Sequence, residues 1–147
     1  MKPEILALAP MIQPCMTALE HNFVVHRLWE AQDRASFLAT AGSNIRAIVT
    51  NGALGANSSL IAALPKLEII ATYGVGVDAI DLALAKSRGI AVTNTPDVLT
   101  DDVADMALAL LLATARRIVF GDNFVRTGQW SRGEMPLTRR VNGKAAG

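Results

Sequence analysis

The sequence predicts an α/β fold, a parallel sheet wound with helices on both faces. Short apolar segments rich in strand-forming residues alternate with helical segments through the first two thirds of the chain. Each strand-plus-helix unit takes about 20 residues, the spacing of consecutive βα units. The rhythm stops near residue 97, where a leucine- and alanine-rich helical segment follows. We therefore expect a parallel sheet followed by a separate helical part.

Composition limits the class of protein. The chain has 147 residues, 51% of them hydrophobic, enough to bury the core of about one domain. Fourteen basic and 13 acidic residues leave a net charge of +1, which does not favour nucleic acid or an anionic membrane as a partner. The single cysteine, Cys15, excludes an internal disulfide framework and fits a reducing compartment. We expect a soluble, cytoplasmic protein.

Strands and helices are expected in strict alternation. Apolar, β-branched runs predict strands at 4–9, 23–28, 45–50, 67–73 and 89–93. Helical spacing between them predicts helices at 15–22, 33–41, 58–64 and 80–87. Pro10 and Pro65 end the elements before them, and Gly42 and Gly89 are expected to end helices in the usual C-terminal manner.

The segment after the sheet predicts one long helix, from about Asp101 to about Arg126. Thr100 is expected to cap its N-terminus, and Gly128 to end it. The helix is apolar nearly all round, so a second domain or a second subunit must cover it.

A glycine turn follows the fourth predicted strand and is the most informative stretch of the chain. Gly74 and Gly76 lack a Cβ, which allows a sharp turn and the close approach of a ligand to the main chain. Asp78 or Asp81 can cap the helix that follows. Unpaired N–H groups at such a place suit an anion, either a carboxylate or a phosphate.

Three interpretations of this turn remain open. Residues 74–79 formally fit the dinucleotide pattern G-x-G-x-x-G/A, and Asp97 lies about 20 residues further on, where that pattern has an acid. Asp78 and Asp81 would, however, repel a doubly charged pyrophosphate, so a single carboxylate is the better electrostatic match. The third possibility is a turn that binds nothing.

Four motifs together resemble one enzyme family. They are Tyr73-Gly-Val-Gly-Val-Asp78, Asn94-Thr-Pro-Asp97, Thr100-Asp-Asp-Val-Ala-Asp105 and Phe124-Val-Arg-Thr-Gly-Gln-Trp130. In combination they resemble the D-isomer-specific 2-hydroxyacid dehydrogenases, within them the glyoxylate/hydroxypyruvate reductases. The resemblance implies a flavodoxin-like substrate domain at 1–97. It implies a crossover helix, a dimer arm and the start of a Rossmann NAD(P)-binding domain at 98–147.

The same resemblance implies a function and site residues. Members of the family reduce small 2-keto acids, such as glyoxylate or hydroxypyruvate, to D-2-hydroxy acids with NAD or NADP as cofactor. By resemblance, Gly74, Val75 and Gly76 bind the substrate carboxylate through backbone N–H groups, and Leu54 lines the substrate pocket. Thr100 matches a position near the nicotinamide end of the cofactor.

The resemblance also implies a homodimer and an incomplete catalytic set. We expect a homodimer through the helix at 101–126, and Trp130 lies in an arm that reaches the partner subunit's active site in some relatives. The family's catalytic arginine, glutamate and histidine have no counterparts here, so no catalytic residue is assigned and the chain alone is expected to be inactive. His21 and His26 are expected to be structural or exposed.

A metal site and two other classes of protein are further alternatives for this sequence. Asp101, Asp102 and Asp105 are better explained as acidic residues that stabilise the positive, N-terminal end of a helix than as ligands of a metal ion, so no metal is expected. The chain could instead be a self-standing flavodoxin-like binding or dimerisation module without catalysis. A weaker alternative is a mononucleotide or flavin site at 74–79.

Overall fold

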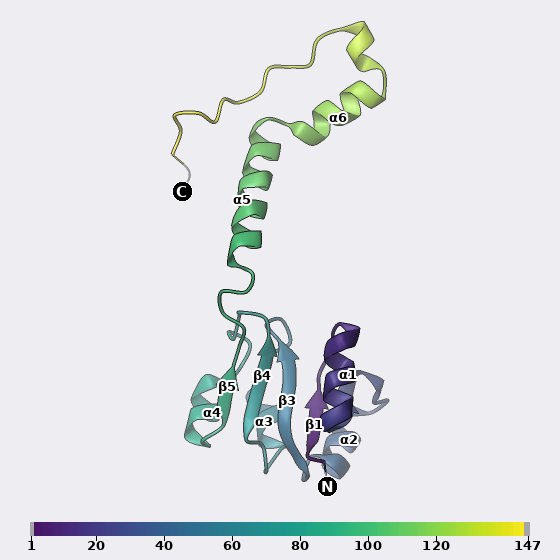
Figure 1. The fold of residues 1–147 in the computed structure, drawn as a ribbon, viewed down its shortest axis with the longest axis vertical. Helices are drawn as coiled ribbons and strands as arrows, with labels where there is room; N and C mark the ends of the chain where they lie inside the picture. Colours follow the sequence, from purple (N-terminus) through teal and green to yellow (C-terminus); the bar gives the residue numbers. More distant parts are fainter. Residues whose placement is uncertain (1, 146–147) are drawn as a thin grey trace. The chain divides into compact units, whose positions relative to one another are not determined.

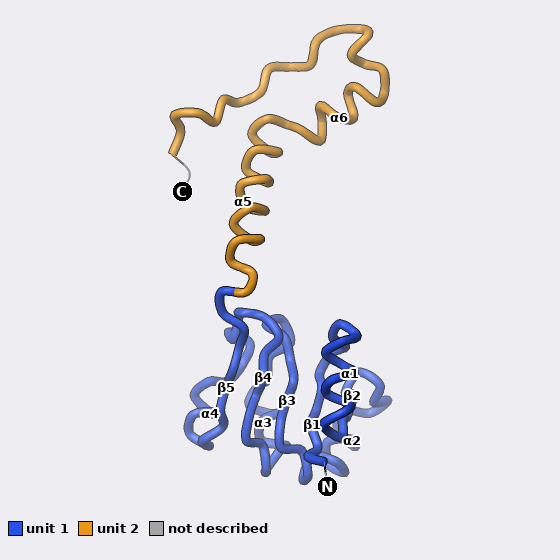
Figure 2. Tube along the Cα trace, in the orientation of Figure 1, with its two compact units in different colours: residues 1–97 blue, residues 98–147 orange. Residues whose placement is uncertain are grey.

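A computed structural model describes residues 2–145 as an α/β structure (Figure 1). The chain forms two compact units, 1–97 and 98–147 (Figure 2). The strands of the first unit are Glu4–Ala7 (β1), Val24–Arg27 (β2), Ile45–Asn51 (β3), Ile69–Tyr73 (β4) and Ala91–Thr93 (β5). Its helices are Gln13–Asn22 (α1), Arg34–Ala41 (α2), Ser58–Ala62 (α3) and Leu82–Ser87 (α4), with a 3-10 turn at Leu28–Glu30. The roles of the two parts, substrate domain and crossover with arm, stay predictions.

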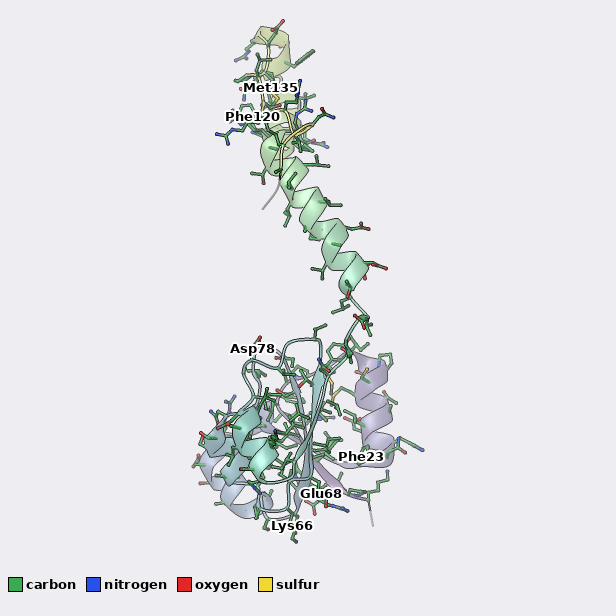
Figure 3. The ribbon with its side chains drawn as sticks, turned by 90° about the vertical axis from the view of Figure 1, so that its left-hand side faces the viewer. Phe23, Lys66, Glu68, Asp78, Phe120 and Met135 are labelled. Atoms are coloured by element: carbon green, nitrogen blue, oxygen red, sulfur yellow. The ribbon has the colours of Figure 1, made fainter. Side chains whose placement is uncertain are left out.

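All five strands form one parallel sheet in the order β2-β1-β3-β4-β5. This is the flavodoxin-like order, and the strand order reverses between β1 and β3. Helices lie on both sides of the sheet, α1 on one and α4 on the other (Figures 1 and 3). The predicted fold is therefore confirmed.

The core lies on the sheet face that carries Leu6, Ile48 and Ile70. These residues are neighbours in the strand register and are completely buried. Ile61 and Leu64, from α3 and the turn after it, belong to the same cluster and are also completely buried. Burying a side chain of this size stabilises a fold by roughly 1.5–3 kcal/mol, so the cluster fixes the central strands against their helices.

Side-chain caps begin α2, α3 and α4, whereas α1 begins without one. Asp33 accepts from Ala35 N at 2.9 Å and Asn57 from Leu60 N at 3.0 Å. Asp81, not Asp78, caps α4 and accepts from Leu84 N at 2.9 Å. The Ser36 hydroxyl and then backbone N–H groups hold the pKa of Asp33 below its usual value, because they stabilise the charged carboxylate.

Gly42 ends α2 for a reason that the sequence did not reveal. Its backbone is right-handed, with φ −57°, so it does not form the left-handed C-terminal cap that was expected. A Cβ at this position would lie 2.4 Å from Leu38 O and 2.7 Å from Ala63 O. The glycine is required by close backbone packing. Gly89, with φ +69°, does follow α4 in the expected left-handed conformation.

The prediction of one helix over 101–126 was wrong. The second unit has two helices, Thr100–Ala115 (α5) and Ile118–Arg126 (α6), and a 3-10 turn at Gln129–Arg132. Arg117 between the helices is left-handed, with φ +50°, and its guanidinium lies 4.3 Å from the Phe120 ring centroid. Ala115 O, freed at the end of α5, accepts from Arg139 N at 3.1 Å.

Thr100 does not cap α5. Leu99 is the cap residue, without a side-chain hydrogen bond, and Thr100 is the first residue of the helix. Gly128 ends α6 as predicted, with φ +72°. Met135 lies against α6: its sulfur would be 3.3 Å from a Cβ at Gly121, close to Phe120 (Figure 3).

Residues 2–145 contain neither a membrane-spanning helix nor a cluster of metal-binding side chains. No helix in that range has both the length and the hydropathy needed to cross a bilayer. Nor does that range contain a group of three or more His, Cys, Asp or Glu side chains arranged to hold a metal ion.

Gly55→Ala tests how the loop after β3 packs. Gly55 has φ +58°, and an added Cβ would lie 2.0 Å from Ala79 O. Gly89→Ala is the matched control, because Gly89 has φ +69° but no heavy atom within 4 Å of the added Cβ. We expect urea unfolding to show that Gly89→Ala lowers the free energy of unfolding by about 1–2 kcal/mol, because only its backbone is strained. Gly55→Ala should lower the free energy of unfolding by about 3 kcal/mol or more, because it adds a steric clash to the strained backbone. Equal losses would contradict the packing described here.

Candidate functional site

The candidate site lies at the carboxyl ends of β3, β4 and β5. Three segments follow these strands: residues 51–57, residues 74–81 and residues 94–95. In open parallel sheets, ligands bind outside this edge. The predicted residues Leu54, Gly74, Val75 and Gly76 all belong to these segments.

Hydrogen bonds from the segment after β5 anchor the glycine turn. Thr95 N donates to Gly74 O at 2.9 Å, and Gly74 N donates back to Thr95 Oγ1 at 3.2 Å. Asn94 Nδ2 donates to Val75 O at 2.8 Å. Gly74 has φ +127°, a conformation that side-chain-bearing residues rarely adopt. Two successive carbonyl groups of the turn are thereby fixed.

Fixing the carbonyls also fixes the N–H groups. In a trans peptide the N–H points opposite to the C=O of the same plane. The peptide planes that carry Gly74 O and Val75 O therefore direct the N–H groups of Val75 and Gly76 away from residues 94–95. Within residues 2–145, neither N–H donates to a protein acceptor. The turn thus offers two adjacent, oriented donors, which is what an anion requires.

Asn51 organises the loop that carries Leu54. Its Oδ1 accepts from Ala53 N at 3.1 Å and from Leu54 N at 2.9 Å. Below it, Thr50 Oγ1 donates to Gly55 O at 2.8 Å. The Leu54 side chain is left 52% exposed, free to contact a ligand.

The loops after β3 and β4 are joined through their backbones. Ala56 N donates to Ala79 O at 3.1 Å, and Asp81 N donates to Ala56 O at 3.0 Å. A Cβ at Gly52 would lie 3.1 Å from Gly76 O, so these two glycines allow close contact between the loops. The loop of Leu54 and the glycine turn therefore form one continuous edge.

The charge of this edge is negative. Residues 51–57 and 74–81 contain no lysine or arginine. The Asp78 side chain is exposed at the rim of the edge (Figure 3), and Asp81 is engaged in capping α4. A carboxylate with one charge can be held by two N–H groups, but its counter-charge must come from outside these loops.

The turn does not fit a dinucleotide pyrophosphate. The Asp81 carboxylate already occupies the N-terminus of α4, where the pyrophosphate of a dinucleotide would lie. The helix is also short, with six residues. The formal match of residues 74–79 to the dinucleotide pattern is therefore not supported by the local geometry.

Two predicted residues belong to the second unit. Thr100 is exposed in the first turn of α5, and Trp130 is 65% exposed in the 3-10 turn after α6. Their predicted contacts, with the cofactor and with a partner subunit, stay predictions.

Asn94, Thr95 and Asn51 had no assigned role in the sequence analysis. Asn94 and Thr95 were noted only as part of a motif, yet they hold the glycine turn. Polar residues directly after a strand that neighbours a glycine turn are the signal that could have found them.

The chain is similar to known 2-hydroxyacid dehydrogenases. The family model described as D-isomer specific 2-hydroxyacid dehydrogenase, catalytic domain, matches residues 5–142. Glyoxylate/hydroxypyruvate reductase A HPR2 of Arabidopsis thaliana is 45% identical over 143 residues, 97% of this chain and 46% of the relative. Glyoxylate reductase of Pyrococcus horikoshii is 42% identical over 134 residues, 90% of this chain and 40% of the relative. The chain spans less than half the length of these relatives.

Two solved structures have the same fold, and this chain again spans less than half of their length. A 2-hydroxyacid dehydrogenase from Ketogulonicigenium vulgare Y25 has a TM-score of 0.87 and 54% identity, over 97% of this chain and 45% of that one. An NADPH-dependent glyoxylate/hydroxypyruvate reductase from Sinorhizobium meliloti, in complex with NADP and malonate, has a TM-score of 0.84 and 36% identity, over 97% and 44%. Since the family model covers nearly the whole chain, the protein belongs to the D-isomer specific 2-hydroxyacid dehydrogenases.

Proposed function

We propose that this chain supplies the substrate-carboxylate site of an NAD(P)H-dependent reductase of small 2-keto acids, such as glyoxylate or hydroxypyruvate. The observation that carries the proposal is the pair of anchored, unpaired N–H groups at Val75 and Gly76. The names of the relatives support the substrate class, because the Arabidopsis and Pyrococcus proteins are reductases of these acids.

In this proposal the glycine turn orients the substrate. The carboxylate oxygens of the keto acid accept from the N–H groups of Val75 and Gly76, which sets the direction of the adjacent keto carbon. Holding a reacting carbon in position can contribute several kcal/mol to lowering a barrier. Leu54, exposed on the joined loop, contacts the substituent of the keto acid and favours small, weakly polar groups.

The nicotinamide cofactor supplies the hydride when bound. The glycine turn does not fit the pyrophosphate of that cofactor, so we assign it to the substrate alone. Thr100 is the one residue of this chain that we propose for a cofactor contact, and its exposed side chain leaves it available.

Neither histidine of the chain lies near the turn. His21 lies in α1, and His26 lies in β2, where its Nε2 is 2.7 Å from Glu4 Oε2. In the sheet, β1 and β3 separate β2 from β4. At a strand spacing of about 4.8 Å, His26 is on the order of 14 Å from the strand that carries the turn. His21 lies in the last turn of α1, just before β2 begins, and so at the opposite edge of the sheet from the turn. Neither histidine can therefore give a proton to a substrate held at the turn.

Asn94→Ala tests the anchor of the turn. Loss of the bond to Val75 O should let the Gly76 N–H reorient, so malonate should bind about tenfold more weakly, as expected for losing roughly 1.4 kcal/mol. Malonate binding can be followed from the amide chemical shifts of Val75 and Gly76. Asn22→Ala is the matched control, because Asn22 Nδ2 makes a similar 2.8 Å bond to a backbone carbonyl, Ala18 O, within α1. Equal malonate affinity in the two variants would refute the role of Asn94.

Absence of turnover is expected for the 147-residue chain alone. The residues that we assign to substrate binding orient the acid but transfer no proton. The decrease of NADPH absorbance with hydroxypyruvate should not exceed the rate without protein, while the Sinorhizobium enzyme, measured beside it, consumes NADPH. Turnover by the chain would show that a catalytic group had been overlooked.

A second candidate function, self-association through the second unit, has its own supporting observation. Large apolar side chains of α5 are exposed, each between 45% and 63%: Val103, Met106, Leu108, Leu110 and Leu112. Val103, Met106 and Leu110 lie on one side of the helix and Leu108 and Leu112 on the other. Exposed apolar residues of this kind indicate an interaction surface. We propose that a second copy covers it, and that the homodimer forms through residues 101–126 with the arm of Trp130 near the partner.

Light scattering measures this association directly. The chain should have about twice the mass of 15.6 kDa at micromolar concentration. Leu108→Glu and Leu112→Glu together should return it to a monomer, because each buries a charge at the interface. A monomeric unmodified chain would contradict the homodimer.

A further inference from the structure

Thr72 carries a buried hydroxyl without a protein partner. The residue lies in β4, two positions before the glycine turn, and is 3% exposed. Its Oγ1 is buried and forms no hydrogen bond with any protein group of residues 2–145. Buried hydroxyl groups are nearly always hydrogen-bonded, because leaving one unpaired loses the hydration it had in the unfolded chain.

The neighbouring strand provides a natural comparison. Thr50 of β3 is the register partner of Thr72 and is also 3% exposed. Its hydroxyl donates to Gly55 O at 2.8 Å and so fixes the loop after β3. Two threonines therefore lie side by side at the same level of the sheet, each below its own loop. Only Thr50 bonds that loop directly.

The loop above Thr72 has unused donors. Thr72 shares a face of β4 with Ile70, the face on which Ala56 and Ile80 belong to the core. Residues 74–81 must cross the end of β4 on this face to reach α4. Among the described residues, no N–H of residues 75–79 donates to a protein acceptor. A buried hydroxyl without a protein partner is thus followed, three residues later in the chain, by a run of N–H groups without protein acceptors.

We infer that Thr72 Oγ1 holds an internal water molecule that links β4 to the glycine turn, and that Thr72 is a positioning residue for that turn. An internal water needs two to four polar partners. Thr72 Oγ1 supplies one, and the N–H groups of residues 77–79, which the carboxylate site does not use, are the donors that we assign to it. Asn94 and Thr95 hold the turn from the side of β5, and the water holds it from the side of β4. The effect on a keto acid rests on the proposed function, whereas the water site itself does not.

The sign of a stability change separates this inference from its alternative. Thr72→Val keeps the shape of the side chain and removes the hydroxyl. If the hydroxyl were unpaired, its removal would raise the melting temperature, because an unsatisfied polar group would be lost. If it holds a water, the melting temperature should fall by about 3–6 °C. An unchanged or higher value would overturn the inference.

Amide hydrogen exchange tests the positioning role. In Thr72→Val, exchange at the hydrogen-bonded amides that hold the turn, those of Gly74 and Thr95, should be about fivefold faster or more, because the turn has lost one link. Thr72→Ser retains the hydroxyl, so it should keep the exchange of the unmodified chain even if the lost methyl lowers stability. Thr50→Val is the control: it should speed exchange at the amides of Ala53, Leu54 and Gly55 and leave those of Gly74 and Thr95 unchanged. The same exchange in the valine and serine variants at position 72 would refute the role.

A direct probe and a ligand measurement complete the test. A water-to-protein nuclear Overhauser effect at the Thr72 methyl should be present in the unmodified chain and in Thr50→Val, and its absence would refute the water. Malonate binding, followed at the Gly76 amide, should weaken severalfold in Thr72→Val but not in Thr72→Ser. If malonate binds no variant while the exchange and water results hold, the proposed function fails and the water site stands.

Discussion

Two hydrogen bonds to carbonyl oxygens determine what the glycine turn can bind. Thr95 N holds Gly74 O, and Asn94 Nδ2 holds Val75 O. Because each peptide is planar and trans, these bonds also direct the N–H groups of Val75 and Gly76. A turn without such anchors would have to lose the freedom of two peptide planes on binding, which costs affinity. Here that ordering is already present in the folded chain.

The sheet makes these anchors possible. Neighbouring parallel strands end at the same edge, so the residues after β5 lie beside the turn after β4. The loop after β3 is joined to the other side of the turn through Ala56 and Ala79. The core of Leu6, Ile48 and Ile70 keeps β1, β3 and β4 in register, and β5 pairs with β4 through Ile70 and Val92. Precision at the site therefore depends on the packing of the sheet, several residues away from any ligand.

The sequence was sufficient for features that depend on local chemistry. The alternation of strands and helices, the glycine turn and the cap of α4 by an aspartate all follow from residue types at short spacing. Features that depend on distant parts of the chain were missed or misread. The bonds of Asn94 and Thr95 to the turn join residues about 20 positions apart, and Gly42 is needed because Ala63 O approaches it. No glycine or proline marks the break between α5 and α6 at Arg117. Hydrophobic periodicity alone does not predict that an arginine adopts a left-handed conformation.

The central claim is that the Val75 and Gly76 N–H groups bind the acid end of a small keto acid. A crystal structure of the chain with oxamate, a stable analogue of such an acid, tests it most directly. The account predicts that the carboxylate of oxamate accepts hydrogen bonds of about 2.9 Å from both N–H groups, with Asn94 and Thr95 still bound to the turn. Oxamate bound elsewhere, with both N–H groups paired to protein acceptors, would contradict it.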